Sequence, residues 1–189
     1  MSLQTWQETL VSAQVAGTLF NTYTTAKTVL PVSCLVSLPA NWWYVGRVIR
    51  VTVYMGISNI VTTPGLMNFQ VNMGAVAAAN SGNVQLNATA HTTLPAMAQC
   101  LCTCRAVGAT TTANLAFQWW INGVMFTKTA AQVDQVNIGD SVAAPVTAPG
   151  VGTGFDSTAA QTLDFFVGFT ISNAGNGVQV QQYIVEALN

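Results

Sequence analysis

The sequence predicts a single-domain, all-β protein, a jelly-roll-like β-sandwich formed from residues 1–189. Three segments alternate between apolar and other residues, which is the period of a half-buried strand. Clusters of Gly, Asn, Thr and Pro separate the apolar runs and favour turns. No long segment shows the period of an amphipathic helix, so we expect strands packed in two layers.

The N-terminal part of the chain carries weaker signals. Residues 1–26 are expected to serve as an arm that contacts a partner. Within this arm, Thr5–Ala16 has some pattern of a short helix, although Thr and Val disfavour one. Lys27–Val36 follows as a weak strand candidate.

The clearest strands are Arg47–Ser58, Leu66–Gly74 and Leu163–Ile171, which are rich in β-branched and aromatic residues. In the first of them, the apolar face carries Ile49, Val51, Val53, Met55 and Ile57, and the other face carries Arg50, Thr52, Tyr54 and Ser58. Each of these segments should bury one face in the core and leave the other outside.

The remaining strand candidates are Ala96–Val107, Ala113–Ile121 and Gly177–Ala187. The apolar face of the last one changes near Gln181, which predicts a β-bulge. Turns are expected at Thr62–Gly65, Asn80–Asn83, Val107–Thr110 and Asn173–Gly177. The patternless stretches Val76–Leu94 and Asn122–Asp156 are interpreted as long irregular loops, which in compact domains usually make functional contacts.

Charge is scarce in this chain. Only 6% of the residues are charged and the net charge is -1, whereas about 25% are charged in a typical soluble domain. Hydrophobic residues make up 51%, but no apolar run reaches the roughly 18 residues of a membrane-spanning helix. Five basic residues are too few for the positive face that binds nucleic acid or anionic lipid. We therefore expect neither nucleic acid nor membrane as a partner.

The residues before Lys27 include no Lys or Arg, so they lack the basic start of a secretory signal. A surface formed mainly by Thr, Asn, Gln and Ser suits permanent packing against neighbouring subunits, because few ions must be desolvated when it is buried. The composition thus predicts a protein that assembles, most simply as a homotrimer.

Cys100, Cys102 and Cys104 form a Cys-x-Cys-x-Cys run that has the look of a metal or redox motif. On a strand, residues two apart share a face but are separated by roughly 6.5–7 Å along the backbone. That spacing is too wide for a disulfide or for three thiolates around one zinc ion. We therefore interpret these cysteines as small core residues, and Cys34 as a further thiol that could reach them only across the sandwich. Free thiols fit assembly in a cytoplasm.

No set of residues predicts catalysis. His91 is the single histidine, and its neighbours include no acid or thiol that could orient it. The acids Asp134 and Asp140 do not match a calcium-loop pattern. Nothing in their spacing selects Asp156 and Asp164 as a hydrolytic pair. We expect the acids to pair with basic residues or to cap turns, and the protein to be no enzyme and to need no cofactor, metal or small-molecule substrate.

Two tryptophan pairs stand out. On a strand, Trp119 would face the core and Trp120 would face outward. Trp42 and Trp43 follow a Pro-Ala-Asn turn at the start of a strand. Because tryptophan is enriched at protein interfaces, we predict that at least one of Trp42, Trp43 and Trp120 lies in an intersubunit or capsid contact. The competing placement is a hydrophobic layer covered by the protein's own long loops. The alternative for Trp120 is stacking on a sugar ring, with Gln118 and Asn122 as polar neighbours.

The stretch Leu38–Val51 reads Leu-Pro-Ala-Asn-Trp-Trp-Tyr-Val-Gly-Arg-Val-Ile-Arg-Val. It resembles a pattern in structural proteins of tailed phages, in which such a turn, an aromatic pair and a Gly lead into an apolar strand. The stretches Gly150–Asp164 and Gln182–Asn189 are similar to the same group. Together the matching stretches cover about a fifth of the chain.

The resemblance implies a β-rich, often jelly-roll-like virion component and brings no catalytic residues. The expected function is that of a capsid decoration or cement protein, bound to the major capsid protein on the phage head. The alternative that the resemblance leaves open is a tail, fibre or receptor-binding module that recognises host-surface glycan. In either role the protein would belong to the virion and be assembled in the host cytoplasm.

Overall fold

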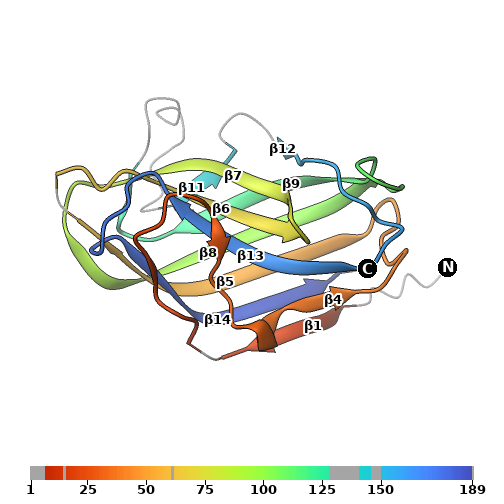
Figure 1. The fold of residues 1–189 in the computed structure, drawn as a ribbon, viewed down its shortest axis with the longest axis horizontal. Coiled ribbons are helices and arrows are strands. Elements are labelled where there is room, and N and C mark those ends of the chain that lie inside the picture. The colour runs from red at the N-terminus through yellow and green to blue at the C-terminus, as the bar shows by residue number, and fades with distance from the viewer. Residues whose placement is uncertain (1–6, 15, 61, 128–140, 146–149, 189) are drawn as a thin grey trace.

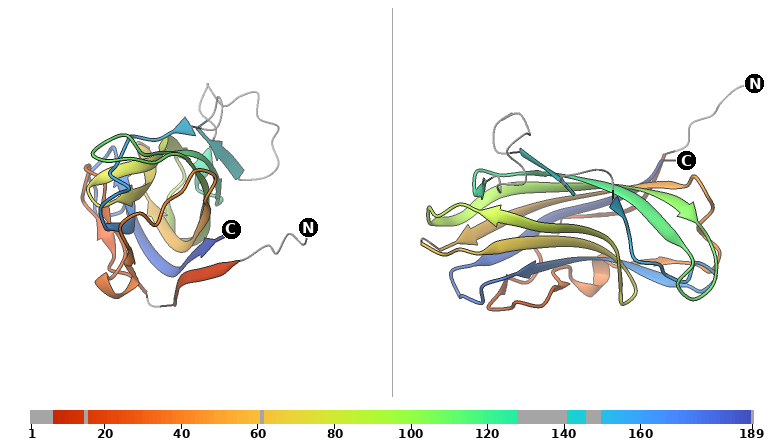
Figure 2. Two further views of the ribbon diagram at one scale, coloured as in Figure 1. Left: turned by 90° about the vertical axis from the view of Figure 1, so that its right-hand side faces the viewer. Right: turned by 90° about the horizontal axis from the view of Figure 1, so that it is seen from above.

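The computed structural model describes residues 7–14, 16–60, 62–127, 141–145 and 150–188. These residues form two antiparallel sheets packed face to face (Figure 1). The predicted all-β, jelly-roll-like sandwich is thereby confirmed. The strands run along the long axis of the molecule, as the two further views in Figure 2 show. No helix in the described part of the chain is long and apolar enough to cross a membrane.

The larger sheet has the order β1-β14-β5-β8-β9-β11, with β2 beside β14 and β12 beside β9. Its strands are β1 (Glu8–Ala13), β2 (Phe20–Asn21), β5 (Val48–Asn59), β8 (His91–Ala106), β9 (Asn114–Asn122), β11 (Ser141–Ala144), β12 (Gly150–Val151) and β14 (Gly177–Ala187). The smaller sheet has the order β10-β7-β6-β13-β3, with β4 beside β13. It contains β3 (Lys27–Thr28), β4 (Val36–Leu38), β6 (Leu66–Met73), β7 (Val76–Leu86), β10 (Phe126–Thr127) and β13 (Gln161–Phe169). A short 3-10 helix, η1 (Val32–Cys34), precedes β4.

At one end of the sandwich the chain crosses repeatedly between the two sheets. Three of these crossings join β5 to β6, β7 to β8 and β13 to β14. Ser58 lies opposite Gly177 and Asn59 opposite His91, so the three crossings are neighbours. The opposite end carries the turn that leads into β5 and the connection from β8 to β9.

The core lies between the sheets and follows the predicted alternation. Phe69 and Phe165 of the smaller sheet contact Trp119 of the larger one, with ring centroids 6.3 Å and 6.2 Å from the indole. All three side chains are fully buried. Burial of each such ring stabilises the fold by about 1.5–3 kcal/mol.

The structure corrects the interpretation of Val76–Leu94 as a loop. Strand β7 occupies most of this stretch and pairs with β6. The turn predicted at Asn80–Asn83 is wrong, because these residues lie within β7 at a point where the register with β6 shifts. Gly82 has a φ of +70°, and the Ser81 hydroxyl accepts a hydrogen bond from the Phe69 N–H at 3.0 Å. A β-bulge therefore stands where the sequence indicated a turn.

The structure also tests the expected bulge in the last strand and the two weak elements near the N-terminus. The bulge near Gln181 is confirmed by a register shift between Val180 and Gln182. The helix considered for Thr5–Ala16 is wrong for Glu8–Ala13, which forms the edge strand β1 against β14. The single strand expected over Lys27–Val36 is divided into β3, η1 and the start of β4, because Pro31 precedes η1 and cannot donate to a ladder. The contact role of residues 1–26 stays a prediction.

Candidate functional site

The segment between β4 and β5 forms two successive turns at the end of the sandwich opposite the crossings. Asn41 and Gly46 adopt positive φ values of 58° and 93°, which Asn and Gly tolerate best. The Arg47 N–H donates to the Tyr44 carbonyl at 3.0 Å. The Gly46 N–H donates to the Cys104 carbonyl at 2.8 Å, which attaches the second turn to β8.

Arg47 contacts two aromatic rings in this segment. Its guanidinium carbon lies 4.0 Å from the centroid of a Trp42 ring and 4.4 Å from that of Tyr44. One guanidinium nitrogen, Nη1, donates to the Trp42 carbonyl at 2.5 Å. Each cation–π contact of this kind stabilises by about 0.5–1 kcal/mol where it is exposed. Stacking on Arg47 restricts the side-chain rotation of Trp42 and Tyr44 in the unbound protein.

Trp43 lies in the core, with only 5% of its surface exposed. Its indole contacts Phe155 edge-on at a centroid distance of 5.9 Å and Trp42 at 4.9 Å. The protein's own residues therefore cover Trp43, and the contact predicted for at least one of Trp42, Trp43 and Trp120 stays a prediction. Trp42 is half-buried, packed against the core on one side and Arg47 on the other.

Tyr44 and Val45 are the most exposed large side chains of this segment, at 45% and 62%. We call Trp42, Tyr44, Val45 and Arg47 the turn cluster. Its only charge lies against two rings, so the surface that it offers to a partner is mainly apolar. The sequence pattern Leu38–Val51 builds this cluster.

A second aromatic surface lies on the outer face of the larger sheet. Tyr54 of β5 and Trp120 of β9 point away from the core and are 42% and 43% exposed. Strand β8 runs between them, with Met97 opposite Tyr54 and Gln99 opposite Trp120. From the spacings of strands and residues, the two aromatic Cα atoms lie about 12 Å apart. The predicted outward position of Trp120 is confirmed.

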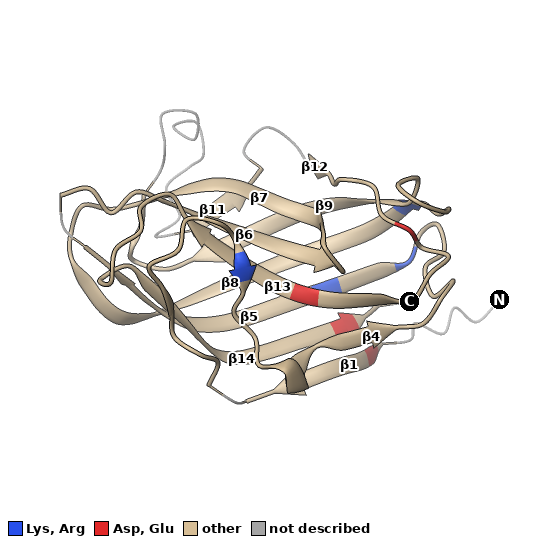
Figure 3. Ribbon diagram, in the orientation of Figure 1, with Lys and Arg blue, Asp and Glu red and all other residues tan. Residues whose placement is uncertain are grey.

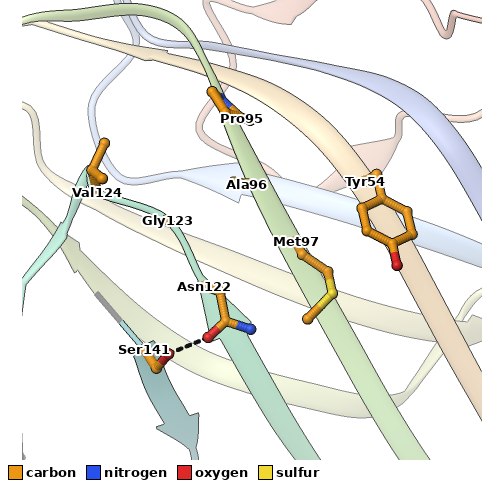
Figure 4. Close-up of a pocket in the computed structure, with 8 residues that line it drawn as sticks. All are labelled: Tyr54, Pro95, Ala96, Met97, Asn122, Gly123, Val124 and Ser141. Carbon is orange, nitrogen blue, oxygen red and sulfur yellow. Dashed lines mark hydrogen bonds between the residues drawn. The ribbon is translucent and has the colours of Figure 1, made fainter. Parts of the chain in front are cut away.

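A hollow of about 390 Å³ opens beside Tyr54 (Figure 4). It is lined by Tyr54, Pro95, Ala96, Met97, Asn122, Gly123, Val124 and Ser141. Figure 4 shows Tyr54 and Asn122 on opposite sides of Met97, whose thioether side chain lies between them. We call Tyr54, Met97, Gln99, Trp120 and Asn122 the sheet-face site.

The amide groups of this site are held by hydrogen bonds. Gln99 Nε2 donates to the Thr52 hydroxyl at 3.2 Å, and the Ser141 hydroxyl donates to Asn122 Oδ1. These bonds orient the Gln99 carbonyl and the Asn122 NH₂ group, which are the remaining acceptor and donor of the two amides. Gln118, predicted as a polar neighbour of Trp120, instead donates to the Ala144 carbonyl at 2.9 Å. Its amide group is therefore committed to the neighbouring strand.

Within the part of the chain that the structure describes, no residue that lines the hollow is charged. Farther along the same face, Arg50 donates to Glu186 at 2.8 Å. The hydrogen bond from Arg50 lowers the pKa of Glu186, and the same bond raises the pKa of Arg50. Figure 3 shows the blue and red segments toward the half of the described ribbon that holds the C-terminus.

Of two further acids, Asp156 caps a turn as the sequence predicted, whereas Asp164 lies within a strand and neither caps a turn nor pairs with a basic residue among the described residues. Asp156 caps a turn by accepting hydrogen bonds from the Thr158 N–H and hydroxyl at 2.8 Å and 2.6 Å. The hydroxyl bond is the main cause of its lowered pKa. Asp164 lies on β13, where it accepts from the Thr28 hydroxyl at 2.9 Å. Asp134 and Asp140 lie outside the described residues.

The three clustered cysteines share the core face of β8, as predicted, and each is 0–1% exposed. The sulfur atoms of Cys100 and Cys102 approach to 3.4 Å, because the side chains lean together from the wider backbone spacing. All four cysteines are free thiols. Burial is the main cause of a strongly raised pKa of Cys100, so its thiolate is disfavoured. In the described residues, no group of three His, Cys, Asp or Glu side chains is arranged to hold a metal ion.

His91 begins β8, where its Nε2 lies 3.1 Å from Asn87 Oδ1. The partner is thus an amide rather than the acid or thiol that would orient a catalytic base. Tyr54 was missed as a site residue, although its place on the outer face of Arg47–Ser58 was readable from the alternation. The signal that could have found it was an aromatic ring among the polar residues of that face.

Comparison with known proteins gives no family. No family model matches the chain, and a search of curated proteins finds no match. Among solved structures, the CBM2 module of the evolved Dit of Lactobacillus casei BL23 phage J-1 is similar with a TM-score of 0.36 and 10% identity, over 99% of this chain and 98% of that one. The Shewanella oneidensis MR-1 protein SO2946, of unknown function, has a TM-score of 0.36 and 11% identity, over 96% of this chain and 78% of that one. At these TM-scores neither likeness carries a conclusion, so the proposals below depend on the residues of this chain.

Proposed function

We propose that this protein is a structural protein of a tailed-phage virion, a decoration or cement protein that binds the major capsid protein and stabilises the head. The observation that carries the proposal is the turn cluster, in which Tyr44 and Val45 are exposed on a segment held by Arg47. The same segment carries the resemblance to phage structural proteins. The exposed segment and the residues that carry the resemblance thus coincide.

The physical basis of the attachment is burial of uncharged surface. An apolar side chain such as Val45 contributes about 1.5–3 kcal/mol when it is fully buried. Restriction of Tyr44 by Arg47 reduces the entropy lost on binding. One such contact is weak, but a homotrimer would offer three, and linked contacts add in free energy when the geometry allows simultaneous binding. No catalytic step is part of the proposal.

The second candidate is a tail or fibre module that recognises host-surface glycan. The sheet-face site favours it, because Tyr54 and Trp120 are exposed beside oriented amides. The two functions use different surfaces of the molecule and are therefore separable by mutation.

The test uses phage particles that lack this protein, to which the purified protein is added back. The double variant Tyr44→Ser/Val45→Ser should lose binding to the particles by at least tenfold, while its melting temperature stays close to that of the wild type. The matched control is Trp120→Ala, which removes an equally exposed ring and should bind particles normally. Wild-type particles should carry hundreds of copies on the head. A few copies at the tail, or normal binding by the double variant, would contradict the proposal.

A further inference from the structure

We propose that the sheet-face site binds a neutral saccharide. The site consists of Tyr54, Met97, Gln99, Trp120 and Asn122 on the outer face of the larger sheet. The inference rests on the second candidate function above and deepens it by naming the class of sugar. The site lies apart from the turn cluster, so the inference does not depend on attachment to the head. A virion protein with both surfaces would be held at one end and would present a sugar-binding face along its side.

The first argument is the exposure of the two rings. Tyr54 and Trp120 keep 42% and 43% of their surface exposed on a folded subunit. The faces of aromatic rings carry partial negative charge. The C–H groups of a pyranose ring carry partial positive charge and form a flat apolar patch. Stacking of a sugar on each ring would cover apolar surface without desolvating an ion.

The second argument is the placement of amides between and beside the rings. Gln99 lies opposite Trp120, and Asn122 follows Trp120 on the same face of β9. Thr52 and Ser141 hold these amides, which leaves the Gln99 carbonyl as an acceptor and the Asn122 NH₂ group as a donor. A donor and an acceptor a short distance apart match neighbouring sugar hydroxyls, each of which both donates and accepts. Met97 forms the apolar floor between them (Figure 4).

The third argument concerns size and charge. The hollow of about 390 Å³ is open and lies on the Tyr54 side of the site, where Met97 and Asn122 line it and Trp120 and Gln99 do not. Its volume is within the range of about 300–1,000 Å³ that is usual for small-ligand sites. The distance of about 12 Å between the two aromatic positions suits a disaccharide or trisaccharide that reaches from one ring to the other. None of the described residues that line the hollow is charged. An acidic sugar would lose hydration there without gaining a counter-ion, so the site favours neutral sugars.

The experiment measures retardation of the full-length protein in native gels that contain a neutral polysaccharide. The neutral probes are laminarin, dextran, galactomannan and xyloglucan, and the acidic probes are polygalacturonate and hyaluronan. A printed array of neutral and acidic oligosaccharides extends the survey. We expect retardation by at least one neutral probe and by no acidic probe. Trp120→Ala and Tyr54→Ala should each weaken it at least tenfold, and Trp120→Phe should restore part of it.

The matched control is Tyr44→Ala, which removes an equally exposed ring from the turn cluster and should leave sugar binding unchanged. Melting temperatures of all variants show that the subunit still folds. If no neutral polysaccharide and no neutral sugar on the array binds the protein, the inference is overturned. It is also overturned if Trp120→Ala and Tyr54→Ala are both retarded as strongly as the wild type. Loss of particle attachment by Trp120→Ala would also overturn it and assign this face to the capsid. The head-attachment proposal is tested separately, by the binding of the Tyr44→Ser/Val45→Ser variant to phage particles, and its failure would not affect these outcomes.

Discussion

The two tryptophan pairs show how a residue's environment depends on its local backbone. In β9, Trp119 is fully buried and its neighbour Trp120 is 43% exposed, as alternation along a strand requires. Trp42 and Trp43 lie between two turns, where no such rule assigns a side, and the sequence left open which of them is exposed. The structure buries Trp43 against Phe155, a contact between segments far apart in the chain. Only the tertiary fold could reveal that contact.

The clustered thiols lead to a prediction for Cys102→Ala. The Cys102 side chain is fully buried and contacts the sulfur of Cys100. Its loss removes one sulfur atom from a packed core, so the free energy of unfolding should fall by about 1–2 kcal/mol. Urea denaturation of both proteins measures the change. Stoichiometric zinc in the purified wild type that disappears in the variant would instead show a metal site.

Asp164 leads to a prediction on pH. Burial raises the pKa of this carboxyl, against the hydrogen bonds from the Thr28 hydroxyl and the Phe165 N–H. The folded state therefore binds the proton more tightly than the unfolded state. The resulting stabilisation is present below the unfolded pKa and is lost as pH rises through the folded pKa.

Asp164→Asn keeps an acceptor oxygen and removes the buried charge. The variant should melt above the wild type at neutral pH. The difference should narrow as pH falls through the raised folded pKa and be closed below about pH 4, where the wild-type carboxyl is protonated in both states. Thermal melts across this pH range measure it. A variant that melts below the wild type at neutral pH would show that the hydrogen bonds to the carboxylate outweigh its desolvation.

At the scale of elements, the alternating strands were predictable and the irregular one was not. β5, β6 and β13 carry long apolar faces, and their positions follow from sequence alone. β7 lacks this signal, because small residues such as Ala78 and Ala79 form its buried positions. Asn80 and Gly82 form a bulge in β7 with residue types that also form turns. Pairing with β6, a tertiary effect, decides the outcome.

The bulge in β7 leads to a prediction for Gly82→Ala. Gly82 has a φ of +70°, and a Cβ atom added there would meet nothing within 4 Å. The cost is therefore backbone strain alone, about 1–2 kcal/mol of unfolding free energy. Gly82→Asn should cost less, because Asn tolerates this conformation better. Denaturant titration of the two variants measures the difference, and equal stability of Gly82→Ala and wild type would contradict the bulge.

At the scale of the molecule, composition predicted the character of the surface and left its geometry open. Low charge indicated contacts through uncharged groups, and the structure places exposed aromatic rings at one end and on one face. Trp120 could be assigned outward because its strand alternates. The proximity of Tyr54 to Trp120 could not be predicted, because the order of β5, β8 and β9 within the sheet depends on pairing between segments far apart in the chain.

The last prediction concerns assembly of the whole molecule. The chain has 11 charged residues, and the Arg50–Glu186 ion pair lies within one subunit. Exposed ion pairs between subunits are weakened by salt, whereas apolar burial is hardly affected. We therefore expect a mass of a homotrimer, above the 19.9 kDa of one chain, in both low and high salt. Size-exclusion chromatography with light scattering measures it. A monomer at micromolar concentration would refute self-assembly, and dissociation in high salt would show that the few charges dominate the contact.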